Sequence, residues 1–578
     1  MRNFKSAWVP TAPVLWYIGV NMKLKTLVTV LLLCCCSWAA AANVPLMPVK
    51  DLQPGMQGIG KTVISGDKIE DFNVEILGVN GSEATGYSIF VRLYGDLIDR
   101  TGGVAQGMSG SPVYIDGRLV GAVAFGKAFN DPHYCFLTPI GSMLKLLDMP
   151  LAHDGAFVPQ GTSLLAGGFT PSGMEYLQEQ LQSVGLEAVN GGSSGDAPGS
   201  DVLQPGSAVG VSLMEGDMSL GALGTVTWTD DEGHILAFGH PFMQRGDSSF
   251  FMNKVWVLGC IPNVQSSYKV GNIGKVIGTI NQDRASGIAG ILGSAPQSIP
   301  VFIAVSDTGR GINSSSRINI IEDEKLVPVI LDAAVFNTVS KTVDRNGGGT
   351  AKLHFEITGV DSNKQQVLID RDNMYYAADN LLKSINGELV EAANILTQNK
   401  FEQVDIYGIS VTAEVSEDVQ VAEILRVTPQ KREVKPGEKL LIDVVLKPYR
   451  GAEFTETIPF VVPQNHPGGK LALSVRGGSS LAWIQNLLRK QKEEGLPAPK
   501  KEVRYKLADF IKNFNEADKN NELIVDVSAA PNLNQPSEKN IAEDAGFAGM
   551  LKGSPYKQKT AFDFIIDGES EFVIDVRK

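Results

Sequence analysis

The feature that most restricts the fold of this chain is a repeated alternation of short apolar runs with tight turns. Glycine occupies 61 of the 578 positions, above its usual share of about 7%. The pair Asp116-Gly117, between two such runs, is a strong hairpin signal. Runs bounded in this way favour antiparallel strands, so we predict a mainly β protein with a few short helices. The runs lie at 62–64, 72–77, 87–93, 208–213, 221–228 and 235–238.

Length and charge narrow the class of protein. A chain of 578 residues is too long for one hydrophobic core, and roughly three to five domains are expected. Lys and Arg total 51 against 64 Asp and Glu, which gives a net charge of −13. Because a surface of that sign repels phosphate backbones, we expect no nucleic-acid partner.

The N-terminal region, residues 1–42, has the pattern of a signal peptide. Lys23 and Lys25 precede an apolar run at 27–36, and Ala40 and Ala42 supply the small residues of a cleavage site. The sequence therefore predicts an exported protein, periplasmic or extracellular, of the bacterial cell envelope. A retained membrane anchor and a lipoprotein remain as alternatives, although the run is short for a transmembrane helix.

Cysteine usage argues against a disulfide scaffold and a metal site. Three of the five cysteines lie at 34–36, so the exported chain keeps Cys135 and Cys260, enough for one disulfide at most. No histidine stands near either of them at zinc-ligand spacing. We expect neither a metal nor another cofactor.

Changes in pattern along the chain suggest its domain boundaries. A Gly/Ser-rich stretch at 190–199 separates two β-rich blocks of one larger domain. Beyond residue 300, runs at 300–305, 327–335 and 352–358 predict further strands, and a helix is expected at 374–385. Nothing in these residues indicates a role for the C-terminal part. The first predicted unit is 43–300, with lobes at 43–150 and 200–300. It is followed by a β-rich domain with a helix at 301–415 and a small β-sandwich at 416–477. The last unit, 478–578, is expected to contain two helices (481–490, 503–514), a polar stretch and a final strand.

Ser109 is the candidate nucleophile, in the sequence GMSGSP at residues 107–112, just before the predicted hairpin. Without side chains at Gly107 and Gly110 the backbone can turn sharply and present Ser109 Oγ outward. The amides of Gly107 and Ser109 would then point at one position, which suits an oxyanion. An ordinary Gly/Ser turn is the alternative interpretation.

His240 is the candidate general base among the six histidines. It lies in the sequence FGHPF, directly after an apolar strand, where a rigid loop would hold the imidazole. His133, in a loop after the serine hairpin, is the rival base. A core histidine bonded to backbone is the alternative for His240.

These segments together resemble a known family. GMSGSP with its hairpin, the sequence GALGTVT at 221–227 and the Gly-His that follows are similar to the SpoIVB sporulation serine peptidases of the chymotrypsin-like clan, over residues 50–300. The resemblance implies a double β-barrel with a serine, a histidine and an acidic residue between the barrels. It makes Ser109 the nucleophile and His240 the base, and leaves Ser111 to turn hydrogen bonding.

This chain departs from the family in two respects. The serine motif precedes the histidine motif here, so the barrels are expected in exchanged chain order, which triad geometry tolerates. The family's aspartate falls near Tyr94, so Asp96 matches only with a shift of two residues. We therefore prefer Asp217, ahead of the histidine strand, as the orienting acid. A turn aspartate that caps local amides is its alternative interpretation.

A match to the phosphate-binding loop is rejected. The sequence GMQGIGKT at 55–62 fits the spacing of that motif, but Pro54 precedes it and β-favouring residues 62–66 follow it. Such a loop needs a strand before it and a helix after it.

The sequence thus predicts a serine endopeptidase that acts on protein or peptide substrates through an acyl-enzyme on Ser109. The alternative is a catalytically inactive scaffold or binding protein with the peptidase fold, whose C-terminal β-domains hold an envelope partner. Self-cleavage alone is an intermediate case.

Overall fold

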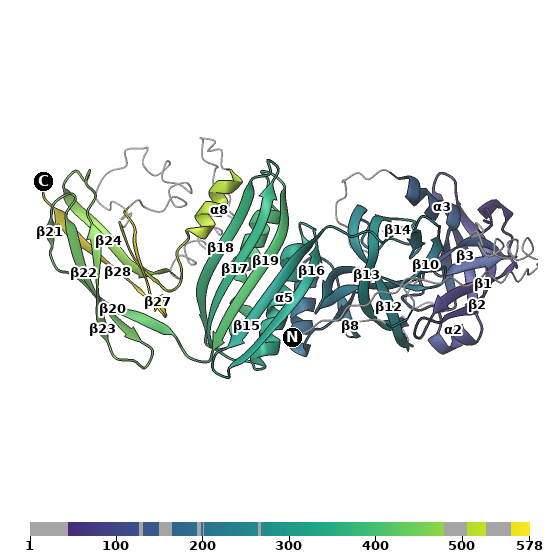
Figure 1. Cartoon of the computed structure of the whole chain (residues 1–578), viewed down its shortest axis with the longest axis horizontal. Helices are drawn as coiled ribbons and strands as arrows, with labels where there is room; N and C mark the ends of the chain where they lie inside the picture. Colours follow the sequence, from purple (N-terminus) through teal and green to yellow (C-terminus); the bar gives the residue numbers. More distant parts are fainter. Residues whose placement is uncertain are drawn as a thin grey trace, which may run out of the picture. The chain divides into compact units, whose positions relative to one another are not determined.

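The computed structural model describes residues 44–126, 131–149, 164–192, 198–199, 202–263, 267–478, 506–527 and 556–578. From Leu46 onward the described chain is mainly β (Figure 1). The predicted signal peptide, residues 193–197 of the Gly/Ser-rich stretch and the helix expected at 481–490 lie outside the described residues.

The first lobe is a closed barrel that contains the serine motif. Its strands pair in the order β1-β2-β3-β6-β5-β4, and β4 closes the ring on β1. Asp116 and Gly117 have φ angles of 48° and 75° in the β4–β5 turn, which confirms the hairpin. The rejected phosphate-loop sequence runs directly into β1. The strands are β1 (Gln57–Val63), β2 (Ile69–Ser82), β3 (Gly86–Tyr94), β4 (Pro112–Ile115), β5 (Arg118–Phe125) and β6 (Tyr134–Pro139), with helices α2 (Asp96–Thr101) and α3 (Ile140–Leu144) and 3-10 turns at Val49–Asp51 and Lys145–Asp148.

The second lobe is also a ring of six strands, and it contains the histidine motif. Pairing runs β9-β12-β13-β14-β11-β10, and β10 pairs back with β9. The mainly β double-barrel fold, with the serine lobe first in the chain, is thereby confirmed. The strands are β9 (Ala208–Gly216), β10 (Ser219–Thr229), β11 (His234–Ala237), β12 (Gly246–Ile261), β13 (Tyr268–Arg284) and β14 (Gly287–Leu292).

An apolar cluster and a short backbone pairing join the two lobes. Val63 of β1 packs with Leu223 and Val255 of the second ring. Gly66 and Val257 exchange two backbone hydrogen bonds of 2.7 and 3.0 Å. These contacts bury apolar surface from both lobes and bring the serine turn against the histidine ring.

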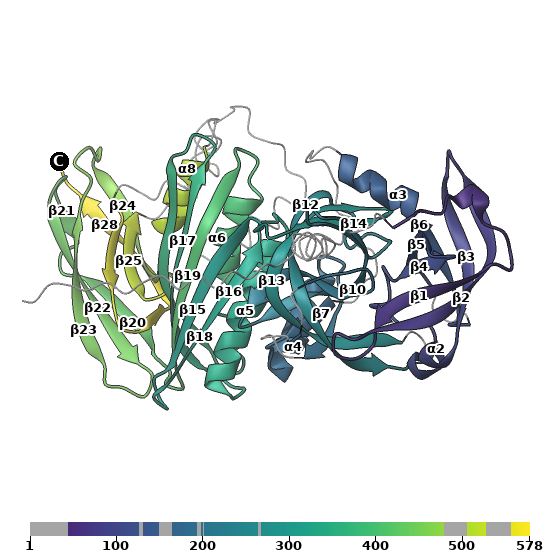
Figure 2. The same ribbon diagram turned by 45° about the vertical axis from the view of Figure 1, so that its right-hand side comes forward.

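The second ring continues into a larger sheet with helices against it. β16 pairs with the end of β9, and the order runs on through β15, β19, β17 and β18, while β7 and β8 extend the sheet beyond β10. Helix α5 lies against β15 and β16 (Figure 2). The added elements are β7 (Leu164–Gly167), α4 (Pro171–Gln182), β8 (Ala188–Gly192), β15 (Ser298–Asp307), β16 (Ile312–Ile321), α5 (Leu326–Val343), β17 (Gly349–Asp361), β18 (Gln366–Ala377), a 3-10 turn at Leu381–Lys383, α6 (Gly387–Thr397) and β19 (Val404–Ser416).

Two local predictions in this region were wrong. The run at 327–335 is part of helix α5, and the segment expected as a helix at 374–385 begins as the end of strand β18. Periodicity cannot distinguish a strand from a helix in a continuous apolar run. Helix α5 is buried on nearly all sides, so its sequence shows no polar face that would identify it as a helix. Among the described residues, α5 is the one helix long and apolar enough to cross a membrane, but 89% of it is buried in the protein.

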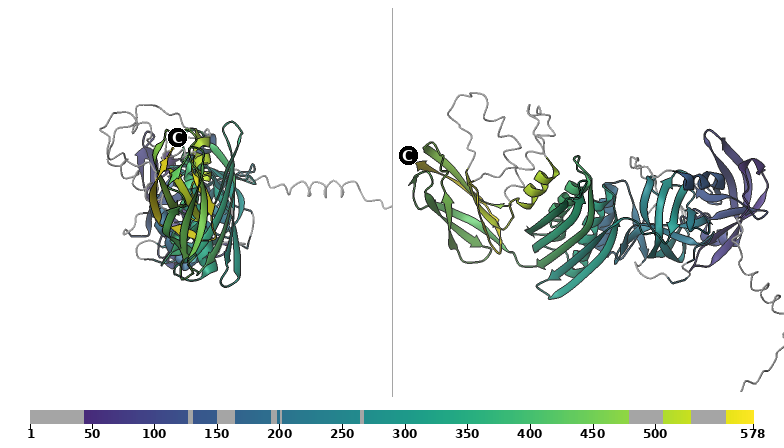
Figure 3. Two further views of the ribbon diagram at one scale, coloured as in Figure 1. Left: turned by 90° about the vertical axis from the view of Figure 1, so that its left-hand side faces the viewer. Right: turned by 45° about the horizontal axis from the view of Figure 1, so that its top comes forward.

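The C-terminal part is a sandwich of two sheets around one apolar core (Figure 3). It extends beyond the predicted 416–477 boundary, because strands after residue 520 complete both sheets. One sheet has β23 (Phe454–Val461), β22 (Lys439–Pro448), β20 (Val421–Pro429) and β27 (Ile565–Asp567); the other has β21 (Glu433–Val434), β28 (Glu569–Val576), β24 (Gly469–Gly477), β25 (Glu522–Val527) and β26 (Gln558–Ala561), with α8 (Leu507–Asn515) before β25.

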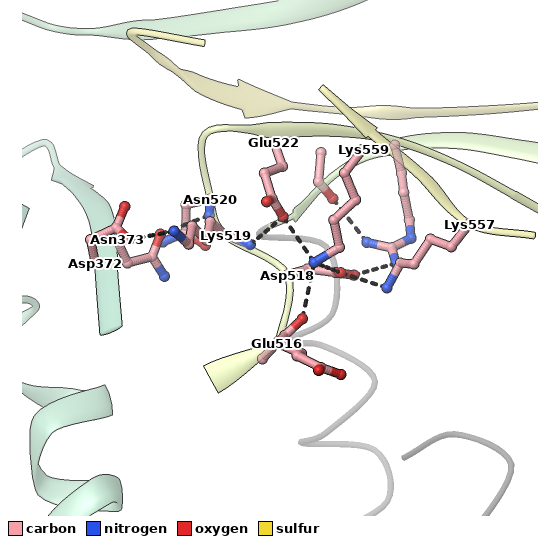
Figure 4. A network of polar contacts seen from close by, with 12 residues as sticks. Asp372, Asn373, Glu516, Asp518, Lys519, Asn520, Glu522, Lys557 and Lys559 are labelled. Atoms are coloured by element: carbon pink, nitrogen blue, oxygen red, sulfur yellow. Dashed lines mark hydrogen bonds and ion pairs between the residues drawn. The ribbon is translucent and has the colours of Figure 1, made fainter. Parts of the chain in front are cut away.

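A buried carboxylate ties the late strands of this sandwich together (Figure 4). Asp518 has a side chain only 1% exposed and forms ion pairs with Arg476, Lys557 and Lys559. Burial alone would raise the pKa of Asp518, but the hydrogen bonds and charges of these cations outweigh it and lower the pKa to about 2. The network therefore stabilises the fold while the carboxylate is ionised.

We expect Asp518→Asn to destabilise the protein by about 3 kcal/mol at pH 7, because it leaves three cations without their shared partner. The contribution should be complete above the ordinary carboxyl pKa of 3.8 and decline as the pH falls towards 2. Urea unfolding at several pH values measures it. Asp563→Asn, at an exposed position of the same sandwich, is the control. Equal losses in both variants would contradict the assignment.

Candidate active site

The turn that carries Ser109 depends on two glycines with positive φ angles. Gly107 has φ +90° and Gly110 has φ +94°, a region that side chains disfavour. A Cβ atom on Gly110 would lie 1.9 Å from the Thr225 carbonyl oxygen. Ser109 itself is half-buried between buried neighbours, so its side chain reaches solvent from an otherwise enclosed turn.

Five consecutive carbonyls of this turn are held by hydrogen bonds. Most of the donors come from β10 and β13 of the second lobe, and the rest from Ser111 within the turn. The predicted turn-bonding role of Ser111 agrees with its contacts. The bonds are Lys269 N to Gln106 O (3.0 Å), Thr225 Oγ1 to Gly107 O (2.9 Å), Ser111 N and Oγ to Met108 O (2.9 and 2.6 Å), Thr225 N to Ser109 O (2.8 Å) and Thr227 Oγ1 to Gly110 O (2.8 Å).

Fixing the carbonyls also fixes the amides. In a trans peptide the N–H points opposite to the preceding C=O, so the held carbonyls of Gln106 and Met108 orient the amides of Gly107 and Ser109. Within the described residues, neither of these two amides donates a backbone hydrogen bond. Two such donors on the nucleophile turn are suited to binding an oxyanion.

His240 follows β11 through a sharp turn. Phe238 and Gly239 have φ angles of 68° and 69°, which redirect the chain just before the imidazole. Thr138 Oγ1 of the first lobe donates to Gly239 O at 2.5 Å. The turn is thus fixed against both lobes, and the half-buried imidazole follows it.

Thr225 brings the two predicted segments together. Its amide donates to Ser109 O at 2.8 Å, and its carbonyl accepts from Phe238 N at 3.3 Å. The Ser109 turn therefore lies beside β10 at the point where β11 leaves it. Segments more than a hundred residues apart in the sequence meet on one residue of the second lobe.

The surroundings of His240 favour a neutral imidazole with its lone pair on Nε2. Nδ1 lies 2.7 Å from the carbonyl oxygen of Pro241, and because a carbonyl only accepts, Nδ1 must carry the proton. Burial lowers the pKa of His240, and the Pro241 carbonyl opposes this shift only in part. Among the described residues, no hydrogen bond joins the imidazole to the Ser109 hydroxyl.

The structure does not bring the proposed acids to His240. Asp217 lies in the β9–β10 turn and accepts from Arg317 N at 2.7 Å. Its eight-residue separation from Thr225 along β10 corresponds to about 25 Å. Asp96 begins α2 and pairs with Arg100. The position beside Nδ1 is taken by the Pro241 carbonyl, which sequence reasoning did not anticipate.

The rival base His133 is engaged elsewhere. Its Nδ1 lies 2.8 Å from Asp131 Oδ1, and its side chain is 38% exposed. Sequence reasoning also assigned no role to Thr225 and Thr227, although both lie in the GALGTVT strand that carried the family resemblance. Their hydroxyls bond carbonyls of the serine turn, a contact that depends on the turn lying against β10.

Two surface groups have the residue types of a metal site. They are Asp230, Glu232 and His234 in the β10–β11 turn, and His354, Glu356 and Asp370 on β17 and β18. In each group the histidine already pairs with an aspartate at 2.8 or 2.9 Å. Within the described part of the chain, the hydrogen bonds of the serine turn involve neither group, so we assign them no part in the site.

Comparison with known proteins gives one match. Residues 39–144 match the model of the SpoIVB peptidase S55 family. The matched segment contains GMSGSP and the first barrel through α3, while His240 lies beyond it. No curated protein and no solved structure matches the chain. The match confirms the family resemblance over the serine lobe and indicates a serine peptidase, a hydrolase of protein or peptide substrates.

We expect Gly110→Ala to destabilise the junction between the lobes far more than Gly117→Ala. Both glycines have positive φ angles, which cost an added side chain about 1–2 kcal/mol, but the space around Gly117 is open. At Gly110 the new Cβ would also overlap the Thr225 carbonyl oxygen. Thermal unfolding of the two purified variants measures the difference. Matching melting temperatures would show that the serine turn is not held against β10 as described.

Proposed function

Since its residues 39–144 carry the SpoIVB peptidase S55 family match, we propose that this chain is an exported endopeptidase with Ser109 as nucleophile and His240 as general base. The observation that supports this most directly is the shared contact of both segments with Thr225. Ser109 and His240, which are both half-buried, therefore belong to segments that bond the same residue of β10.

The proposed reaction proceeds through an acyl-enzyme. His240 Nε2 takes the proton of Ser109 Oγ, and Oγ attacks the carbonyl carbon of the scissile peptide. The amides of Gly107 and Ser109 stabilise the tetrahedral oxyanion. His240 then protonates the leaving amine, and water hydrolyses the ester by the same proton transfers in reverse order.

In this mechanism the Pro241 carbonyl takes the place of an orienting acid. It holds the Nδ1–H tautomer, which puts the lone pair of the base on Nε2. It brings no full negative charge to stabilise the imidazolium. Asp217 stays outside the mechanism because its carboxylate is bonded to the backbone of Arg317.

Export and a role at the bacterial cell envelope form the second part of the proposal. The support is the pattern of residues 1–42, with its basic residues, apolar run and small residues before Asn43. The C-terminal sandwich provides a domain separate from the barrels that could hold an envelope partner. A peptidase-fold scaffold without catalysis is the competing function.

We expect a fluorophosphonate probe to label the wild-type protein and not Ser109→Ala, and the variant should lose peptide hydrolysis by a factor of about 10⁴ or more. Mass spectrometry of the labelled peptide identifies the modified residue, and cleavage of fluorescein-labelled casein measures hydrolysis. Absence of labelling in folded wild type would favour the scaffold. A chain shortened only in the wild type would indicate self-cleavage.

Activity should persist to lower pH than an ordinary histidine base allows. Because burial lowers the pKa of His240 below 6.5, the imidazole stays neutral at pH 6.5 and is protonated only under more acidic conditions. The labelling rate measured against pH should therefore show its acid limb below 6.5. His240→Gln should abolish labelling, whereas His354→Gln, on an exposed strand, should leave the profile unchanged. An acid limb above 6.5 would argue against this base.

A further inference from the structure

A buried lysine lies directly behind the serine turn. Lys269, at the start of β13, is 3% exposed, and its Nζ donates to Thr62 Oγ1 at 2.9 Å. The same Nζ lies 3.5 Å from Thr225 Oγ1. Its methylene groups run beside Gly107, where an added Cβ would lie 3.0 Å from Lys269 Cδ. Within the described residues Lys269 forms no ion pair.

The protons of this cluster can be placed from donor and acceptor chemistry. An ammonium has donors only, so both threonine hydroxyls must accept from it. The Thr225 hydroxyl has a single proton, and it is given to Gly107 O at 2.9 Å. The Thr62 and Thr225 hydroxyls are 3.4 Å apart, so without the ammonium they would compete for each other's protons.

We propose that Lys269 is a positioning residue for the nucleophile turn: through Thr62 and Thr225 its ammonium directs a hydroxyl proton onto the Gly107 carbonyl. That bond holds the peptide between the two oxyanion-binding amides. The inference rests on the proposed function, since it assigns Lys269 a role in the reaction of Ser109 without contact to the reacting atoms.

The charge of Lys269 changes near neutral pH. Burial lowers its pKa to about 7, and only the negative charge of an ionised Cys260, its neighbour across β12 and β13, would oppose that shift. The pKa of Cys260 is itself raised by burial, so the thiol is neutral near pH 7. Within the described residues, Nζ contacts the hydroxyls of Thr62 on β1 and Thr225 on β10, which do not titrate. Above pH 7 the neutral amine gains a lone pair that competes for the hydroxyl protons.

Keeping this charge in the interior costs stability. A buried ammonium without a carboxylate is unfavourable, and an apolar side chain of similar volume would pack there at lower cost. If Lys269 had only a packing role, methionine at this position would therefore stabilise the protein more than the lysine does. Stability and activity should change in opposite directions when Lys269 is replaced.

The test measures fluorophosphonate labelling and thermal unfolding of the full chain for Lys269→Met. We expect an equal or higher melting temperature, a maximal labelling rate lower by about 10- to 100-fold, and an unchanged half-saturation concentration. A wild-type labelling rate would overturn the proposal. A fall in melting temperature with activity lost only in proportion to unfolded protein would also overturn it, since Lys269 would then be structural.

A second pair of variants tests the same chain of bonds without touching the lysine. Thr225→Ser keeps the hydroxyl that bonds Gly107, whereas Thr225→Val keeps the shape and removes it. We expect Thr225→Ser to label at close to the wild-type rate and Thr225→Val to be slower by about 10-fold or more. Equal rates in the two variants would overturn the proposal even if Lys269→Met failed to fold.

The wild-type protein supplies the third measurement. Its labelling rate should decline as the pH rises through about 7, and this alkaline limb should be missing in Lys269→Met. Persistence of the limb in the variant would contradict the assignment. Ser109→Ala separates the two proposals: if it still labels, the proposed function fails, but if it does not label while the Lys269 and Thr225 variants match wild type, only this inference fails.

Discussion

The hydrogen bonds between β10 and the serine turn are the constraint on which the rest of the site depends. Thr225 contributes its amide, its hydroxyl and its carbonyl to three bonds, with Ser109, Gly107 and Phe238. Since the bonds to Ser109 and Gly107 cross from one lobe to the other, the site exists only when both rings are folded. The glycines of the turn are required for the same reason, because a side chain at Gly110 would occupy the position of the Thr225 carbonyl oxygen.

Burial shifts the titration of both ionisable groups around this site towards the neutral form. It lowers the pKa of His240, which keeps the imidazole available as a base, and it lowers the pKa of Lys269 to about 7. The two groups serve different parts of the proposed reaction. A narrow working range near neutral pH follows from the same low-polarity junction that holds the lobes together.

Part of the fold and site could be predicted because it is encoded locally. The Asp116-Gly117 turn and the strands around GMSGSP follow from short-range backbone preferences. Helix α5 was mistaken for a strand because a run buried on nearly all sides carries no periodicity. The late strands of the sandwich were missed as partners of earlier ones, since strand pairing over a hundred residues leaves no local signal.

The amino-acid pattern is sufficient to predict a mainly β chain, the serine turn with its two glycines, the histidine loop and the family resemblance over the serine lobe. The tertiary structure is needed to show that Thr225 joins these segments, that Asp217 in the β9–β10 turn bonds the Arg317 amide, and that the Pro241 carbonyl bonds the imidazole. The reason is physical: a turn or a strand reflects the preferences of neighbouring residues, whereas hydrogen-bond partners and burial depend on which distant segments the closed rings bring into contact.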